Sequence, residues 1–340
     1  MRQFISRFIS CLFLFSLSSL VLADHKINHT QNILWASPKG FDLTLDVTVP
    51  ETKTKAKPVL VIFHGGGWLL NNKSIMTDLA DSIASRTDVI TVNVNYRLLS
   101  DVNNTTTMNE LVEDAMGAVL WVKENIKSYG GDPNNVAVTG DSAGGHLAAM
   151  VTLAGRNLGS NRFDKKPLSF KPTYLPKGKT AEQVAQEDGL KLKAAILSYA
   201  VYSLVDTAQS GFETEKNQFW KFANAKPRGF FGDKINVKDN IDYYDAVSPN
   251  HYLVNAREYK FPRQFVHSGE LDPLTTPERA RDYVAQLKSL GQPIVLKIYP
   301  GKTHGFLDSG CNEYNHGCFK ELSEPAVSEM IGFLNDVFGL

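Results

Sequence analysis

Ser142 lies in a pentapeptide whose residue types and spacing indicate nucleophilic chemistry. The segment reads Gly140-Asp141-Ser142-Ala143-Gly144; it follows an apolar run at residues 136–138 and precedes a stretch rich in Ala, Leu and Met. Between a strand and a helix, G-x-S-x-G forms a sharp turn that presents the serine hydroxyl and leaves room only for small neighbours. We therefore predict that Ser142 is the nucleophile of a serine hydrolase. A surface turn of small residues is the alternative.

A serine hydroxyl needs a base that takes its proton, and the base needs an acid that orients it. After a nucleophile of this type, the acid and then the histidine follow along the chain. His304 comes directly after an expected strand and lies between Gly301 and Gly305, so we predict it as the base. His316 lies between two cysteines and is predicted to be structural. The other histidines, His146 among them, show no ligand spacing.

Two carboxylates are candidates for the acid. The segment Gly269-Glu270-Leu271-Asp272-Pro273-Leu274 follows another expected strand. Asp272 has the shorter side chain, and the proline after it helps to fix the loop. Glu270 points to the opposite side if the chain is extended there. We predict Asp272 as the acid and keep Glu270 as the alternative; either residue can instead cap the following helix.

A glycine-rich segment, His64-Gly65-Gly66-Gly67-Trp68, follows the apolar run Val59–Phe63. Glycines let backbone N–H groups approach a substrate oxygen closely. We predict an oxyanion hole made by the amides of Gly65, Gly66 and Ala143, and a structural role for His64. A flexible loop or a phosphate-binding turn is the alternative, but no Lys or Ser/Thr follows at P-loop spacing. Two residues beside these motifs are candidates for the substrate pocket: Trp68 and Asp141.

The elements that position these residues follow from hydrophobic patterning. Residues 41–49 alternate with period two, as a half-buried strand does, whereas Val59–Phe63 and Val89–Val94 are continuous apolar runs typical of buried parallel strands. Further strands are expected at 194–199, 264–267 and 294–298, with helices at 108–129, 277–290 and 325–338. The alternation predicts an α/β fold with a mostly parallel sheet covered by helices on both faces. Every motif above falls at the carboxyl end of a strand, where such sheets bind ligands.

Two segments do not fit this alternation. Residues 156–190 are polar, with several prolines and lysines, and residues 205–252 mix charges with aromatic side chains. Insertions of this length are usually lids, caps or binding loops. We expect them to form a cap or pocket wall. The aromatic residues either line that wall or pack the insertion onto the sheet.

Composition bounds the class of protein. The chain has 340 residues, 43% of them hydrophobic, and its formal net charge is zero. This is enough to bury a large core in one α/β domain. The balanced charge gives no electrostatic footprint for nucleic acid or for an anionic membrane, so neither partner is expected.

The first residues have the pattern of a secretory signal peptide. Arg2 and Arg7 precede an apolar stretch at residues 8–22, and small residues allow cleavage after Ala23. An uncleaved anchor is the alternative, but the stretch is short and carries four serines, so it would span a bilayer poorly. We expect a secreted or periplasmic domain, residues 24–340, with no membrane span.

The cysteines agree with export. Cys11 would leave with the signal peptide, and the mature chain keeps Cys311 and Cys318. An even pair in an exported chain predicts a disulfide. Reduced thiols, or a metal site with His316, are the alternatives; the spacing matches no common zinc site, so no metal is expected.

Together these motifs resemble those of a known family. The segments are His64–Trp68, Asn95-Tyr-Arg-Leu98, Gly140–Gly145, Asp272-Pro-Leu274 and His304-Gly-Phe306. They resemble α/β-hydrolase-fold carboxylesterases of the hormone-sensitive-lipase-like type, and bacterial acetyl and feruloyl esterases are similar. The resemblance implies an eight-stranded sheet, no cofactor and carboxylic-ester substrates.

We therefore expect an exported serine carboxylesterase that hydrolyses small to medium esters through an acyl-enzyme. An amidase or peptidase with the same triad, or a non-catalytic ligand-binding protein of this fold, remains the alternative.

Overall fold

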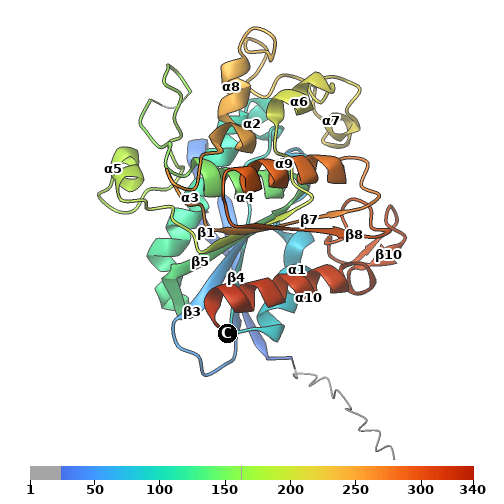
Figure 1. The fold of residues 1–340 in the computed structure, drawn as a ribbon. Helices are drawn as coiled ribbons and strands as arrows, with labels where there is room; N and C mark the ends of the chain where they lie inside the picture. The colour runs from blue at the N-terminus through green and yellow to red at the C-terminus, as the bar shows by residue number, and fades with distance from the viewer. Residues whose placement is uncertain (1–23, 162) are drawn as a thin grey trace, which may run out of the picture.

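The computed structural model describes residues 24–161 and 163–340, so the predicted signal peptide at residues 1–23 lies outside the described part of the chain. One large sheet forms its centre (Figure 1). The strands of this sheet are β1 (Ile27–Ala36), β2 (Leu43–Pro50), β3 (Lys57–Phe63), β4 (Ile90–Val94), β5 (Gly131–Asp141), β6 (Ala194–Ser198), β7 (Arg263–Gly269) and β8 (Ile294–Tyr299).

The sheet has eight strands in the order β1-β2-β4-β3-β5-β6-β7-β8. β2 runs antiparallel to both of its neighbours, and the other pairings of the sheet are parallel. The predicted fold class, a mostly parallel eight-stranded sheet flanked by helices, is confirmed. The period-two pattern of residues 41–49 corresponds to β2, whose side chains alternate between buried and half-buried along most of its length.

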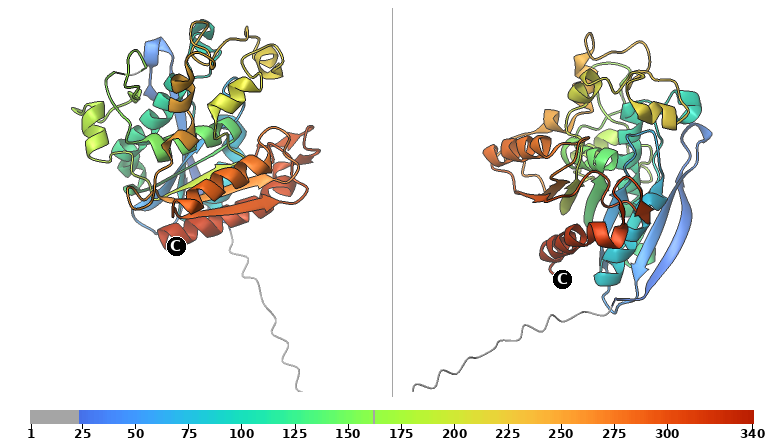
Figure 2. Two further views of the ribbon diagram at one scale, coloured as in Figure 1. Left: turned by 45° about the horizontal axis from the view of Figure 1, so that its top comes forward. Right: turned by 90° about the vertical axis from the view of Figure 1, so that its right-hand side faces the viewer.

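Helices cover both faces of the sheet. α1 and α10 lie on one face, and α3, α4 and α9 lie on the other (Figures 1 and 2). The helices are α1 (Thr77–Arg86), α2 (Asp101–Asn104), α3 (Met108–Asn125), α4 (Ser142–Ala154), α5 (Ala181–Gln186), α6 (Leu204–Gln209), α7 (Gln218–Phe222), α8 (Ile241–Ala246), α9 (Pro277–Ser289) and α10 (Phe319–Phe338), with short 3-10 turns at Pro38–Gly40, Lys73–Met76, Ile126–Tyr129 and Pro249–Tyr252.

The central strand β3 is apolar from Pro58 to Phe63 because both of its faces are buried. Val61 and Phe63 belong to the core between the sheet and the layer of α3, α4 and α9. Leu60 and Ile62 belong to the core on the side of α1 and α10. Because successive side chains of a strand point to opposite faces, a strand buried between two helical layers needs apolar residues throughout.

The two insertions lie on the side of α3, α4 and α9. Residues 156–190 form mostly irregular chain with the short helix α5, and residues 205–252 hold α7 and α8 and most of α6 (Figure 1). Within the second insertion, Phe230 packs against Phe212 and Tyr244 with ring centroids 5.1 and 6.0 Å apart. Phe230 and Tyr244 belong to the same hydrophobic core as the sheet, so these rings pack the insertion onto the rest of the domain.

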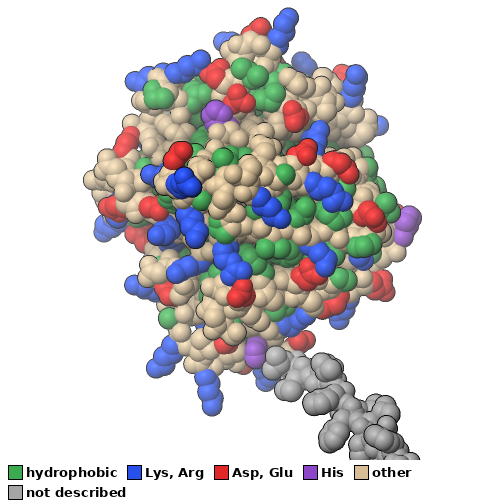
Figure 3. All heavy atoms as spheres, in the orientation of Figure 1, with side chains coloured by type: hydrophobic (Ala, Val, Ile, Leu, Met, Phe, Trp, Pro, Cys, Tyr) green, Lys and Arg blue, Asp and Glu red, His purple; other side chains and the backbone are tan. Residues whose placement is uncertain are grey.

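The surface carries mixed charge. On the face drawn in Figure 3, basic and acidic side chains are interspersed. Among the described residues, no helix has both the length and the apolar composition that crossing a membrane requires.

Candidate active site

The turn between β5 and α4 holds Ser142 in a strained conformation. Its φ is 51°, in the left-handed region that residues with a side chain rarely adopt. The turn is closely packed: a Cβ on Gly144 would lie 2.0 Å from the carbonyl oxygen of Phe63, and one on Gly140 would lie 2.3 Å from that of Gly144. The glycines are therefore required by this geometry, which presents the serine hydroxyl at the start of α4.

The structure brings Ser142, His304 and Asp272 together in one hydrogen-bonded chain. His304 Nε2 lies 2.9 Å from Ser142 Oγ, and its Nδ1 lies 2.8 Å from Asp272 Oδ2. The three residues follow β5, β8 and β7, whose carboxyl ends meet at the same edge of the sheet. This is the arrangement in which a histidine removes the proton of a serine hydroxyl.

Asp272 is held by its own loop. The backbone amides of Leu274 and Thr275 donate to Oδ1 at 2.8 and 2.9 Å, and the Thr275 hydroxyl donates to Oδ2 at 2.9 Å. Burial raises the pKa of Asp272, but its hydrogen bond with His304 and these amides outweigh burial and hold the pKa below its ordinary value. An ionised Asp272 keeps the proton of the imidazole on Nδ1, so Nε2 is free to accept from Ser142.

Glu270, the alternative acid, lies elsewhere. Its side chain is exposed and accepts a hydrogen bond from the backbone amide of Gly301 at 3.0 Å.

Thr275 was not predicted from the sequence. Besides holding Asp272, its hydroxyl lies 3.2 Å from Nδ1 of His304. No sequence motif marks this threonine, because its role depends on how the loop folds back.

The glycine-rich loop differs from the prediction at Gly65. The Gly65 amide hydrogen-bonds to the Asp141 carboxyl, and a Cβ on Gly65 would lie 2.4 Å from Asp141 Oδ2. Gly65 is therefore turned toward Asp141, whereas Gly67 lines the same pocket as Ser142 and Ala143. Gly66 has a φ of 117°, and a Cβ there would lie 2.2 Å from the carbonyl oxygen of Leu70. The predicted donor Gly65 is thus turned toward Asp141, and the neighbouring Gly67 borders the pocket that contains Ser142.

Asp141 is also placed differently from the prediction. It does not line the substrate pocket but is 3% exposed, behind the nucleophile. Burial and the charge of the neighbouring Asp308 raise its pKa well above the usual value. Burial likewise raises the pKa of Asp308 to about 6. Tyr199, whose ring packs edge-on against His304 at 4.9 Å, hydrogen-bonds to Asp141, so this acidic pair lies close to His304.

Trp68 lines the cavity that contains Ser142 and is fixed by His146. The indole Nε1–H donates to His146 Nδ1 at 3.2 Å, so Nε2 carries the proton and donates to the Val247 carbonyl at 2.8 Å. Burial lowers the pKa of His146 to about 4, which keeps the ring neutral. His146 thereby joins the nucleophile helix α4 to the end of the 205–252 insertion.

His64 is structural. Its Nδ1 lies 2.8 Å from the Gly65 carbonyl, its ring stacks on Tyr96 with a centroid distance of 4.4 Å, and burial lowers its pKa to about 4.

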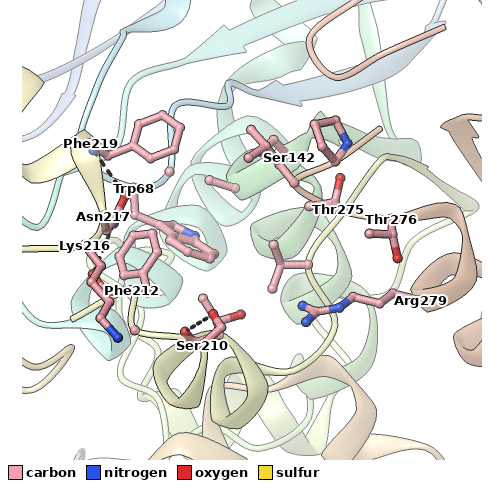
Figure 4. A pocket seen from close by; sticks show the side chains of 17 residues that line it. Trp68, Ser142, Ser210, Phe212, Lys216, Asn217, Phe219, Thr275, Thr276 and Arg279 are labelled. Atoms are coloured by element: carbon pink, nitrogen blue, oxygen red, sulfur yellow. Dashed lines mark hydrogen bonds between the residues drawn. The ribbon is translucent and has the colours of Figure 1, made fainter. Parts of the chain in front are cut away.

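The pocket beside Ser142 has a volume of about 360 Å³ (Figure 4). The glycine loop, the nucleophile, the second insertion and the start of α9 all contribute to its walls. The lining residues are Gly67, Trp68, Ser142, Ala143, Val201, Thr207, Ser210, Gly211, Phe212, Lys216, Asn217, Phe219, Pro273, Leu274, Thr275, Thr276 and Arg279. The expected insertion 205–252 therefore supplies a pocket wall, and its aromatic residues both line the pocket and pack the insertion.

Cys311 and Cys318 form a disulfide across a small hairpin of β9 (Cys311–Asn312) and β10 (Gly317–Cys318). Within this hairpin, the Asn315 side chain accepts a hydrogen bond from the hydroxyl of Thr303, the residue before the catalytic histidine. His316 belongs to the same loop. Within the described ranges, no group of three or more His, Cys, Asp or Glu side chains is placed to hold a metal ion.

Comparison with known proteins places these observations in context. The sequence profile of the alpha/beta hydrolase fold matches residues 60–308. Carboxylesterase NlhH of Mycobacterium tuberculosis is 33% identical over 273 residues, which cover 79% of this chain and 74% of NlhH. The probable carboxylic ester hydrolase LipM of the same organism is 28% identical over 254 residues, 74% of this chain and 50% of LipM. The chain thus spans about half the length of LipM.

A similar solved structure is that of Thermogutta terrifontis esterase 2 phosphorylated by paraoxon. It superposes with a TM-score of 0.62 at 20% identity and covers 91% of this chain and 94% of that one. At this identity the likeness concerns the fold.

Proposed function

The chain belongs to the alpha/beta hydrolase fold family, as its motifs predicted, and on this premise we propose that it is a serine carboxylesterase. The observation that carries the proposal is the continuous hydrogen-bonded chain from Ser142 through His304 to the buried Asp272. The substrates are small to medium carboxylic esters, which suit a pocket of about 360 Å³.

The reaction proceeds in two steps through an acyl-enzyme. His304 Nε2 takes the proton of Ser142 as the serine oxygen attacks the ester carbonyl carbon. The protonated imidazole then gives this proton to the alcohol oxygen, the carbon–oxygen bond breaks, and the alcohol leaves. Water enters, loses a proton to His304 and attacks the acyl carbon. The tetrahedral intermediate collapses, the serine oxygen regains the proton and the carboxylic acid is released.

The developing oxyanion is bound by backbone amides. The first N–H groups of a helix have no partner within the helix, and Ala143 lies directly after Ser142 at the start of α4. In the described structure, the amides of Gly66 and Gly67 donate no hydrogen bond to another backbone group. We therefore assign the oxyanion hole to Gly66, Gly67 and Ala143, each donor contributing about 3 kcal/mol to the stability of the transition state.

Export is part of the proposal. The signal-peptide pattern of residues 1–23 and the disulfide between Cys311 and Cys318 both suit a secreted or periplasmic enzyme. Mass spectrometry of the protein from the culture medium or periplasm should find an N-terminus at Asp24. A full-length N-terminus in the cytosol would contradict export.

The esterase proposal is tested by hydrolysis of p-nitrophenyl acetate, butyrate and octanoate. The wild type and Ser289→Ala, which changes an exposed serine on α9, should turn over at least the shorter esters, and Ser142→Ala should not. Paraoxon should label the wild type once per chain with release of one p-nitrophenolate. Labelling without ester turnover would favour the amidase or peptidase alternative. A folded protein that shows neither would favour a non-catalytic ligand-binding protein.

A further inference from the structure

Two cationic side chains line the pocket that contains Ser142. Lys216 lies on the loop between α6 and α7, and Arg279 lies in the first turn of α9. Figure 4 shows them on opposite sides of the pocket with Ser210 between them, both apart from Ser142. They come from segments more than sixty residues apart, so the fold, rather than local sequence, brings both to one cavity.

The charged side chains that the described structure places in the pocket lining are all positive. Of the residues in the described structure that line this pocket, two are cationic and none is acidic. The acids next to them in the sequence, Glu215 and Glu278, are exposed and do not line the cavity. Arg97, which borders another cavity, is by contrast held by Asp114 and Glu110.

From this lining we propose that the preferred substrates are esters that carry a carboxylate on the part remote from the scissile bond, bound by Lys216 and Arg279. The inference rests on the proposed esterase function and specifies its substrate class. Serine and threonine hydroxyls and the amide of Asn217 line the same cavity and suit the polar surroundings of such a group. Thr276, the N-cap of the 13-residue helix α9, also lines the cavity, so the positive end of that helix borders it.

The expected effect is moderate because both cations are exposed to water. Each exposed ion pair should raise the affinity for the ester roughly twofold to fivefold. Salt should weaken them, because the Debye length falls from about 10 Å at 0.1 M to about 3 Å at 1 M. A neutral ester of the same size should be insensitive to both the cations and the salt.

The test compares esters that differ by one negative charge. Monomethyl and dimethyl adipate place the charge on the acyl side, and 4-acetoxybenzoate and its methyl ester place it on the alcohol side. The measured quantity is the ratio of kcat/KM for the charged ester to that for the neutral ester, by pH-stat at low and high salt. The variants are Lys216→Gln, Arg279→Gln and the double variant. Lys221→Gln on α7 and Arg281→Gln on α9 are controls, since these residues are exposed cations outside the pocket lining.

For at least one pair of esters, the wild-type ratio of kcat/KM should exceed one, and it should fall about tenfold in the double variant. The kcat/KM of the double variant for the neutral ester should stay within about twofold of wild type. The ratios of the two control variants should also stay within about twofold of wild type. High salt should lower the wild-type ratio in the same direction. A ratio that the double variant leaves unchanged in both pairs, while neutral esters are hydrolysed, overturns this inference and leaves the esterase proposal standing. If the wild type hydrolyses no ester of either pair, both proposals fail.

Discussion

The replacement Asp308→Asn should make the protein more stable at neutral pH and less dependent on pH. Asp308 follows the catalytic loop and lies near the buried Asp141 and His304. Burial raises the pKa of Asp308 from 3.8 to about 6, although the nearby His304 acts in the opposite direction. The folded protein therefore holds a proton on this carboxyl at pH values where the unfolded chain has lost it.

The magnitude follows from the shift. A change of one pKa unit corresponds to 1.36 kcal/mol, so the rise from 3.8 to about 6 corresponds to about 3 kcal/mol at most. Because the folded state has the higher pKa, this stability is fully present below about pH 4, is lost as the pH rises toward about 6, and stays lost above it. Asn cannot ionise, so the variant avoids the loss. The neighbouring Asp141 titrates together with Asp308, which makes about 3 kcal/mol an upper limit.

The assay is the thermal midpoint between pH 4.5 and pH 8. At pH 7.5 the Tm of Asp308→Asn should exceed that of the wild type by roughly 5 °C, and the two should converge near pH 4.5. Asp282→Asn, at an exposed position on α9, is the control and should track the wild type across the range. A variant that is no more stable than wild type at pH 7.5, or that differs from it equally at every pH, would refute the reasoning.

Three further outcomes are expected. Asp272→Asn should lower kcat for p-nitrophenyl butyrate by about 10⁴ while circular dichroism stays native, because an amide cannot hold the required imidazole tautomer; a loss below tenfold would contradict this role. Gly66→Ala should reduce kcat at least about a hundredfold, since its Cβ would lie 2.2 Å from the Leu70 carbonyl and displace an oxyanion donor; unchanged kcat would rule that donor out. Without reductant, the free energy of unfolding of the double variant Cys311→Ser/Cys318→Ser should be about 2 kcal/mol lower than that of the wild type, and with reductant the two should be equal. Equal urea midpoints without reductant would show that the disulfide adds no stability.

Strands with a regular hydrophobic pattern could be predicted from the sequence, and the mostly exposed edge strand β1 could not. The apolar run Val59–Phe63 predicts β3 because each of its side chains must enter a core. β1 was not predicted: most of its side chains are exposed, so pairing with β2 imposes no hydrophobic pattern on its sequence. A strand of this kind is defined by backbone hydrogen bonds that side-chain patterning does not report.

The start of the last helix differs from the prediction because a capping box fixes it at an earlier residue. The last helix was expected to begin at Pro325, because proline favours a first turn. The structure begins α10 six residues earlier, at Phe319, directly after the disulfide hairpin, and keeps Pro325 inside the helix. Cys318 and Glu321 form a capping box at its start, so this cap sets the boundary.

The meeting of Ser142, His304 and Asp272 could be predicted because each lies in a motif with its own backbone requirement. Ser142 needs small neighbours, and His304 and Asp272 need short loops after strands. Thr275 and Tyr199 could not be predicted in this way, because their contacts with the catalytic residues depend on loops folding back onto the sheet. Gly65 and Asp141 lie near Ser142, as the motifs predict, but they face each other, because packing decides the direction of each residue.

His146 links the second insertion to α4 and stays uncharged at neutral pH. His146 lies one helical turn after Ser142 on α4, accepts from Trp68 and donates to the carbonyl of Val247 at the end of the second insertion. Because burial lowers the pKa of its imidazole to about 4, both hydrogen bonds persist through neutral pH. The end of the second insertion therefore keeps its attachment to the helix that begins at Ser142 across that pH range. If Lys216 binds a substrate carboxylate as proposed, its contribution should not change between pH 6 and pH 8 through His146, because this ring stays uncharged there.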